Sequence, residues 1–255
     1  MRLHHEFQGR GRPLVLLHGF LGSSDNWRNM RKRFEGNYKV LAVDLRNHGN
    51  SPHSDTMNYI AMAEDLRQLL SHQGLSNIFL VGHSMGGKVA MQFACESPDQ
   101  IEKLIVVDIA PKAYPPSQRP LLQAMQRLDL RTLKSYGEAQ AALALAVPDL
   151  SLRKFLVKNL ARGPDGNFRW RIGLDSLAAN YENLINALDL SQSFAKPTCF
   201  IRGARSGFIE DEDLATVREH FPRAEFHTVA NAAHWVHIDA PDEFYQVVDE
   251  FFRRP

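Results

Sequence analysis

Residues 78–87 read Ile78-Phe79-Leu80-Val81-Gly82-His83-Ser84-Met85-Gly86-Gly87. They join an apolar, strand-like segment to a helix-like segment that contains no glycine or proline between Lys88 and Cys95. A serine in the pattern G-x-S-x-G at such a strand-to-helix bend is typical of a hydroxyl held out as a nucleophile. Glycines two residues before and after Ser84 remove the Cβ atoms that would collide where strand and helix pass closely. The stretch therefore predicts an α/β fold with a serine nucleophile.

A serine hydroxyl hardly ionises at neutral pH, so it needs an imidazole to accept its proton and an acid to orient that imidazole. Among the eleven histidines, the best candidate for the base is His234, in the run Ala230-Asn231-Ala232-Ala233-His234-Trp235. This run follows the strand-like segment 225–229 and precedes a helical pattern over 241–252. A histidine on a loop just past a strand end can approach Ser84, and serine first with histidine last is one known order of such triads.

Further motifs along nearly the whole chain resemble the α/β-hydrolase superfamily. The run Leu14-Val15-Leu16-Leu17-His18-Gly19-Phe20 is similar to the strand that ends in His-Gly and carries half of the oxyanion hole. Residues 44–51 are similar to the D-x-R-x-x-G-x-S turn of that superfamily. A narrower combination resembles the bacterial YbfF-type esterases and their mitochondrial relatives: Asn47-His48-Gly49, residues 82–88, Asp108-Ile109-Ala110-Pro111, and Asn159-Leu160 followed by residues 166–171.

The position of the acid that orients the imidazole departs from the commonest layout of that superfamily. In that layout the acid lies three residues past the glycine that ends the next-to-last strand. Here that strand ends at Gly203 and the residue three positions on is Ser206, which cannot carry a negative charge at neutral pH. Asp108 follows the apolar run 104–107, which the fold would place beside the nucleophile strand, and the narrower resemblance also implies an acid there. A turn-forming role for Asp108 stays open. The alternative acids are Glu210, Asp211 and Asp213.

Two backbone N–H groups are expected to stabilise the negative oxygen that forms when a carbonyl is attacked. One belongs to Met85, directly after the nucleophile and at a helix start, where the helix dipole assists. The other belongs to Phe20, after His18-Gly19. Lys88, one helical turn past Ser84, is expected to be solvated or ion-paired rather than a second base.

Short strand-like runs alternate with helical ones, which predicts a mostly parallel sheet covered by helices on both faces. Between about Pro111 and Ala195 no convincing strand is present, and apolar spacing predicts helices near 121–128, 139–147 and 174–188. We therefore expect an α/β-hydrolase core domain over 1–110 and 196–255. A helical lid subdomain over 111–195 is inserted before the last two strands and should set substrate choice.

Composition excludes several classes of partner. Of 255 residues, 30 are basic and 29 acidic, giving a net charge of +1 that offers no general attraction for nucleic acid or membranes. Cys95 and Cys199 are expected to be reduced core residues. No signal peptide or membrane span is evident, so cytoplasm is the expected location. The histidines His48, His53 and His237 are too scattered for a metal site, and neither a metal nor a cofactor is expected.

These residues predict a carboxylesterase or thioesterase that works by acyl transfer on Ser84, His234 and Asp108. The narrower resemblance implies small-molecule esters with short or medium acyl chains, and possible acyl-CoA thioesters; oligomeric state stays unknown. A C–C hydrolase, an aminopeptidase or a perhydrolase would use the same triad. A non-catalytic ligand-binding protein is the fourth alternative. Four basic residues of the expected lid are candidates for contacts with a phosphate-bearing leaving group: Arg119, Arg127, Arg131 and Arg162.

Overall fold

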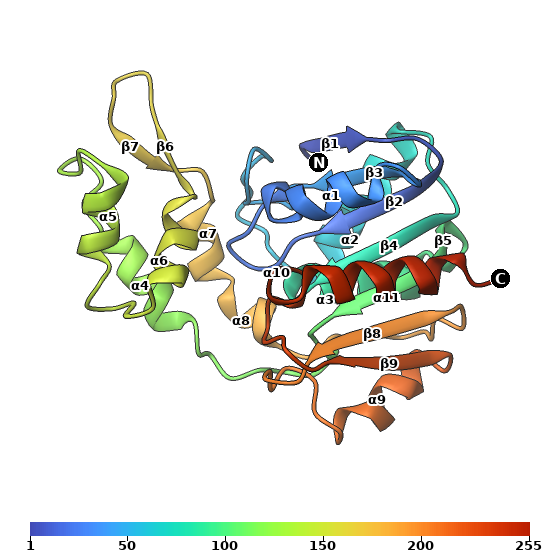
Figure 1. Ribbon diagram of the computed structural model, residues 1–255. Coiled ribbons are helices and arrows are strands. Elements are labelled where there is room, and N and C mark those ends of the chain that lie inside the picture. The colour runs from blue at the N-terminus through green and yellow to red at the C-terminus, as the bar shows by residue number, and fades with distance from the viewer.

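The computed structural model describes all 255 residues, Met1 to Pro255, around one seven-stranded sheet (Figure 1). Across this sheet the strand order is β1-β3-β2-β4-β5-β8-β9. The strands are β1 (His5–Gln8), β2 (Arg12–Leu17), β3 (Tyr38–Val43), β4 (Ile78–His83), β5 (Ile101–Val107), β8 (Thr198–Gly203) and β9 (Ala224–Val229). Only β1 is antiparallel to its neighbour, whereas all other pairs are parallel. The predicted α/β-hydrolase architecture is confirmed.

Helices cover both faces of the sheet, because successive strand residues point to opposite sides. Leu14 and Leu16 belong to one buried cluster and Val15 and Leu17 to the other. The first face is covered by α1 (Arg28–Phe34), α10 (Val236–Asp239) and α11 (Pro241–Arg253). The second face is covered by α2 (Tyr59–His72), α3 (Met85–Glu96) and α9 (Asp213–His220). Short 3₁₀ turns occur at Ser24–Trp27 and Pro98–Gln100.

Between β5 and β8 the chain leaves the sheet and forms a group of short elements beside it, on the left in Figure 1. We refer to residues 111–195 as the lid segment; its status as a subdomain stays a prediction. Its helices are α4 (Arg119–Gln126), α5 (Tyr136–Ala142), α6 (Leu150–Val157), α7 (Leu174–Ala179) and α8 (Tyr181–Ile185). None of the helices in the protein has the length and apolarity that a bilayer span requires.

The expectation of a purely helical insertion was wrong in one place. Strands β6 (Leu160–Arg162) and β7 (Phe168–Trp170) form an antiparallel hairpin within the lid segment. Each strand has three residues, too few to show the alternation that reveals a strand in a sequence. Gly166, with a φ of 78°, makes the left-handed turn between them.

The two cysteines are core residues as expected, Cys95 in α3 and Cys199 in β8. Cys95 and Cys199 are buried and unpaired. Burial raises the pKa of the Cys95 thiol to about 12, so it stays protonated and behaves as a small apolar side chain.

Candidate active site

Ser84 lies at the bend between β4 and α3 in a strained conformation. Its φ of 52° and ψ of −119° fall outside the regions that a residue with a side chain usually adopts. The Ser84 N–H donates to the carbonyl of Val107 at 3.0 Å, which fixes the bend to the neighbouring strand β5. A Cβ on Gly82 would lie 2.2 Å from the carbonyl oxygen of Gly86. The glycines are therefore needed for the close passage of strand and helix, as predicted.

His234 lies on the loop between β9 and α10 and faces Ser84. Its Nε2 is 3.0 Å from the Ser84 Oγ, and its Nδ1 is 2.8 Å from Oδ2 of Asp108. The ring stacks on Phe208, with centroids 4.0 Å apart and planes 21° apart. Behind it, Nε2 of His83 is 2.8 Å from the backbone oxygen of His234. Packing and hydrogen bonds thus hold the imidazole in one orientation, while 21% of its side chain stays exposed.

Asp108 directly follows β5 and is completely buried. Its Oδ1 accepts the backbone N–H of Gly203 at 3.0 Å, and its Oδ2 accepts hydrogen bonds from His234 and from the Ser206 hydroxyl. Ser206 occupies the position at which an acid was sought and found missing. Ser206 is not the acid, as expected, but its hydroxyl supports the acid that follows the neighbouring strand, a role that its place in the sequence does not indicate.

The three alternative acids have other partners. Oδ2 of Asp213 lies 2.7 Å from Lys112 Nζ, and a Glu210 oxygen lies 3.5 Å from the same nitrogen. Asp211 pairs with Arg202 at 2.8 Å. None of them contacts His234, so Asp108 is the one carboxylate that bonds its imidazole.

The peptide between Gly19 and Phe20 is held rigidly beside Ser84. The Gly19 carbonyl accepts the N–H of Gly22 at 3.0 Å and lies 2.8 Å from Nδ1 of His18. In a trans peptide the N–H points away from the carbonyl, so the N–H of Phe20 faces the opposite side. A Cβ on Gly19 would lie 3.3 Å from the Ser84 Cβ, which shows how closely this peptide passes the hydroxyl.

The second expected donor is the N–H of Met85. As the first residue of α3 it has no acceptor within its own helix. Phe20 and Met85 line the same cavity as Ser84. Two backbone N–H groups of residues that line the Ser84 cavity are thus the candidate donors of an oxyanion hole.

Two buried histidines that sequence analysis left without a role hold the loop after β2 in place. Nε2 of His18 accepts the N–H of Leu45 at 3.0 Å, which leaves the proton of that ring on Nδ1. Nε2 of His48 accepts the N–H of Leu21 at 3.2 Å, while its Nδ1 lies 2.9 Å from the Arg46 carbonyl. Burial lowers the pKa of His48 to about 3, so it accepts this bond as a neutral ring. The feature of the sequence that could have indicated this role of His48 is the Asn-His-Gly motif in the turn.

Ser84 lines two cavities. We call the first, of about 60 Å³, the Lys88 cavity and the second, of about 70 Å³, the Trp235 cavity. The Lys88 cavity is lined by Phe20, Tyr59, Ser84, Met85, Lys88, Ile109, Tyr114, Pro115, Ser117, Gln118, Tyr181, Leu184, Ile185 and Phe208. The Trp235 cavity is lined by Gly19, Phe20, Leu21, His83, Ser84, Gln118, Leu121, Leu152, Phe155, His234 and Trp235.

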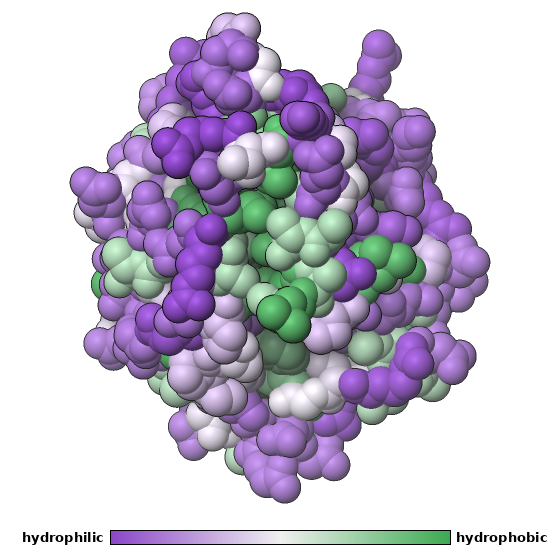
Figure 2. Space-filling model, turned by 90° about the vertical axis from the view of Figure 1, so that its left-hand side faces the viewer, coloured by the Kyte–Doolittle hydropathy of each residue, from purple (hydrophilic) through white to green (hydrophobic).

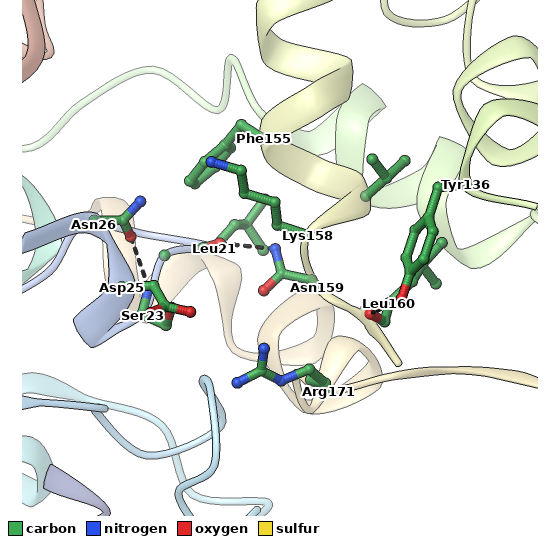
Figure 3. A pocket seen from close by; sticks show the side chains of 12 residues that line it. Leu21, Ser23, Asp25, Asn26, Tyr136, Phe155, Lys158, Asn159, Leu160 and Arg171 are labelled. Atoms are coloured by element: carbon green, nitrogen blue, oxygen red, sulfur yellow. Dashed lines mark hydrogen bonds between the residues drawn. The ribbon is translucent and has the colours of Figure 1, made fainter. Parts of the chain in front are cut away.

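A third cavity, the Lys158 cavity, has a volume of about 410 Å³ and lies between the loop after β2 and the lid segment (Figure 3). It shares Leu21 and Phe155 with the Trp235 cavity, so the two adjoin. Lys158 and Arg171 bring two cations to it, and Asp25 brings an acid. Figure 2, which views the lid side, shows apolar residues gathered around a central hollow with polar residues surrounding them.

The lid arginines considered from the sequence do not line any of these cavities. Arg119 pairs with Glu182, and Arg131 pairs with Asp129. Arg162 lies over the Phe168 ring at 4.5 Å. The cations Lys158 and Arg171 instead line the adjoining Lys158 cavity.

Lys88 is neither solvated nor ion-paired, so this expectation was wrong. The residue is 1% exposed, and its Nζ donates to the backbone oxygen of Asn186 at 2.6 Å. The nitrogen lies 5.5 Å from the ring centroid of Tyr59 and 5.0 Å from that of Tyr114. Burial lowers the pKa of Lys88 to about 7.

Comparison with known proteins decides the family. A family model described as the alpha/beta hydrolase fold matches residues 12–241. The chain belongs to the α/β-hydrolase family. This hydrolase is 37% identical over 246 residues to the sn-1-specific diacylglycerol lipase ABHD11 of Mus musculus, covering 93% of this chain and 80% of the relative. It is 30% identical to esterase YbfF of Escherichia coli (strain K12), covering 96% and 94%.

A solved structure named marine microorganism esterase matches this hydrolase with a TM-score of 0.96 and 37% identity, over 98% of this chain and 99% of that one. The resemblance to YbfF-type esterases is thereby confirmed. Because these relatives are named as esterases or a lipase, they support hydrolysis as the class of reaction.

Proposed function

We propose that this hydrolase cleaves carboxylic esters through an acyl-enzyme on Ser84. The observation that carries the proposal is the unbroken chain from Ser84 Oγ to His234 Nε2 at 3.0 Å and from His234 Nδ1 to Asp108 at 2.8 Å. Both distances lie within the range in which protons transfer between hydrogen-bonded groups. The names of the relatives favour esters over the C–C, peptide and peroxide reactions that the same groups would support.

In the proposed reaction His234 takes the Ser84 proton while Oγ attacks the ester carbonyl. The buried carboxylate of Asp108 orients the imidazole and stabilises the imidazolium that forms. The carbonyl oxygen becomes negative and accepts hydrogen bonds from the N–H groups of Phe20 and Met85. The C–O bond then breaks, and His234 gives its proton to the departing alcohol. Water repeats the sequence on the acyl-enzyme, giving the carboxylic acid and restoring Ser84.

In this proposal each of the two cavities at Ser84 holds one part of the substrate. We assign the acyl group to the Lys88 cavity, because Met85 and Phe20, which bind the carbonyl oxygen, line it. A cavity of about 60 Å³ holds a chain of only a few atoms, since a single water already needs about 10–15 Å³. The proposal therefore favours short acyl chains.

The leaving group would occupy the Trp235 cavity, which His234 lines, and extend toward the Lys158 cavity. The cations Lys158 and Arg171 suit a long, anionic leaving group, so thioesters of a phosphate-bearing thiol are included in the proposal. Residues 111–195 line all three cavities, in keeping with a lid subdomain over a core of 1–110 and 196–255.

Hydrolysis of p-nitrophenyl butyrate tests the proposal. Ser84→Ala should lower kcat/KM by at least about 10³-fold, because no other group can carry the acyl fragment. A fluorophosphonate should label the wild-type protein but not the variant. Ser71→Ala is the control, since Ser71 is exposed on α2 and lines none of the three cavities, and its rate should stay within threefold of wild type. Undiminished hydrolysis by Ser84→Ala, or an inert and unlabelled wild type, would refute the mechanism.

A further inference from the structure

Lys88 is a basic side chain in the lining of a mostly apolar cavity. It lies one helical turn past Ser84, where its N–H donates to the Ser84 carbonyl at 3.1 Å. The side chain is almost completely buried and lines the Lys88 cavity together with Met85, Ile109 and Leu184. An acyl group on Ser84 would therefore extend toward the Lys88 ammonium.

No acid neutralises this ammonium. The only polar partner of Nζ is the Asn186 carbonyl, which occupies one of its three N–H donors. The facing phenols do not help, because Tyr59 donates its proton to the Leu184 carbonyl and Tyr114 donates to the Phe208 carbonyl. Burial raises the pKa of both phenols well above the usual value, so they remain neutral.

A buried cation without an opposite charge is costly, and proteins usually pair such groups. The low pKa of Lys88, about 7, has desolvation as its cause. A carboxylate in the cavity would supply the missing charge and accept the two unused N–H groups. A purely apolar acyl chain would instead leave the ammonium without an opposite charge and two of its N–H groups without an acceptor. The cavity thus has a chemical preference that its apolar walls alone would not provide.

We propose that the Lys88 cavity binds acyl groups that end in a carboxylate, so that the preferred substrates are half-esters or half-thioesters of short dicarboxylic acids. The proposal rests on the proposed function, since it names the acyl group that Ser84 receives. Lys88 acts on specificity and takes no part in the proton transfers. The competing explanation is that Lys88 only attaches the segment after α8 to α3 through its bond to Asn186.

The test compares each half-ester with a neutral ester of the same chain length. Monoethyl succinate and monoethyl glutarate are paired with ethyl butanoate and ethyl pentanoate, and acid release is followed by pH-stat titration at pH 6.5. Ethyl esters are used because aryl half-esters hydrolyse themselves through the neighbouring carboxylate. The measured quantity is the ratio of kcat/KM for the half-ester to kcat/KM for its neutral partner.

Wild type should give a ratio above one for at least one pair. Lys88→Met, which replaces the side chain by an unbranched apolar one a single atom shorter, should lower that ratio by about 10- to 100-fold, the range expected for a charge-assisted hydrogen bond. Lys88→Gln, which retains an N–H donor for Asn186, should lower it as well. Lys112→Met is the control, because Lys112 lies 5.6 Å from the same Tyr114 ring but outside the cavity, and the ratio should not change.

The outcomes separate the two proposals. If wild type cleaves neutral esters but gives ratios below one, or if Lys88→Gln keeps the wild-type ratio, the carboxylate site is refuted and the esterase proposal stands. If Lys88→Met fails to fold, the wild-type ratios and the ratio of Lys88→Gln still test the carboxylate site. A wild type that cleaves neither ester refutes the proposed function and the carboxylate site with it.

Discussion

At the scale of single residues, the carboxylate of Asp108 links three segments through hydrogen bonds to His234, Ser206 and Gly203. Asp108→Asn keeps the shape but can present an N–H to Nδ1 of His234, which favours the wrong tautomer of the ring. We expect kcat/KM for p-nitrophenyl butyrate to fall by about 10³- to 10⁴-fold with the melting temperature nearly unchanged. Asp211→Asn, whose carboxylate pairs with Arg202, should retain activity. Loss of activity in Asp211→Asn instead would assign the acid to the other loop.

The residues of the candidate site were predictable where a local pattern encodes them. Ser84 and His234 each follow a strand and precede a helix, and that context is visible in the sequence. Asp108 was chosen from the strand end that it follows and from the family resemblance together, because its own segment also fits a turn former. The supporting role of Ser206 was not anticipated, and Lys88 was misjudged, because their partners Asp108 and Asn186 lie 98 residues away in the chain in both cases. Such contacts depend on strand order and helix placement, which residue spacing does not reveal.

At the scale of elements, helix α3 passes β2 so closely that only glycine fits at position 86. A Cβ on Gly86 would lie 2.5 Å from the His18 carbonyl oxygen and 2.6 Å from the Leu17 oxygen. These are backbone atoms that cannot swing aside. Gly86→Ala should therefore lower the free energy of unfolding by about 1–3 kcal/mol or more, measured by urea denaturation. It should also lower kcat, because any shift of α3 moves the Met85 N–H.

The matched control is Gly137→Ala in α5. The nearest atom to a Cβ there is the Ser135 Oγ at 3.7 Å, which is ordinary contact. Alanine is favoured over glycine within a helix, so this change should raise the free energy of unfolding by about 0.5–1 kcal/mol. Equal effects of the two substitutions would show that the close approach of α3 to β2 is not what requires glycine.

Elements with a strong period were predictable, and those in the lid segment were less so. The apolar strands β4 and β5 and the amphipathic helix α11 appear close to the ranges read from the sequence. The span 174–188 read as one helix but forms α7 and α8, with Asn180 between them. Asn180 donates to the Asp55 carbonyl across the molecule, a tertiary contact that helical spacing does not indicate.

At the scale of the whole molecule, the sheet and its covering helices bury four histidines in neutral form. Burial lowers the pKa of His18, His48, His83 and His237, that of His48 and of His237 to about 3. In the unfolded chain each takes up a proton near pH 6.5. The folded state, which keeps these rings neutral, therefore has its full free energy of unfolding above that pH. This free energy falls as pH drops from 6.5 toward the folded-state pKa values, because only the unfolded chain takes up the protons. Each such histidine steepens the loss by about 1.4 kcal/mol per pH unit.

His237 isolates one of these contributions. Its ring stacks on Trp27 with centroids 4.3 Å apart, and neither ring nitrogen has a hydrogen-bond partner. His237→Phe retains an aromatic ring and removes the group that the unfolded chain protonates. The drop in the free energy of unfolding between pH 7.5 and pH 5, measured by urea denaturation, should shrink by about 2 kcal/mol.

His72→Gln serves as the comparison, because this side chain is exposed at the end of α2 and is not enclosed by the packed layers; the drop should stay at its wild-type size. If His237→Phe changed the free energy by the same amount at both pH values, His237 would have to bind protons equally well folded and unfolded. Burial of His237 against the sheet would then not disfavour its charged form. The loss of free energy of unfolding at low pH would have to arise from the carboxylates instead.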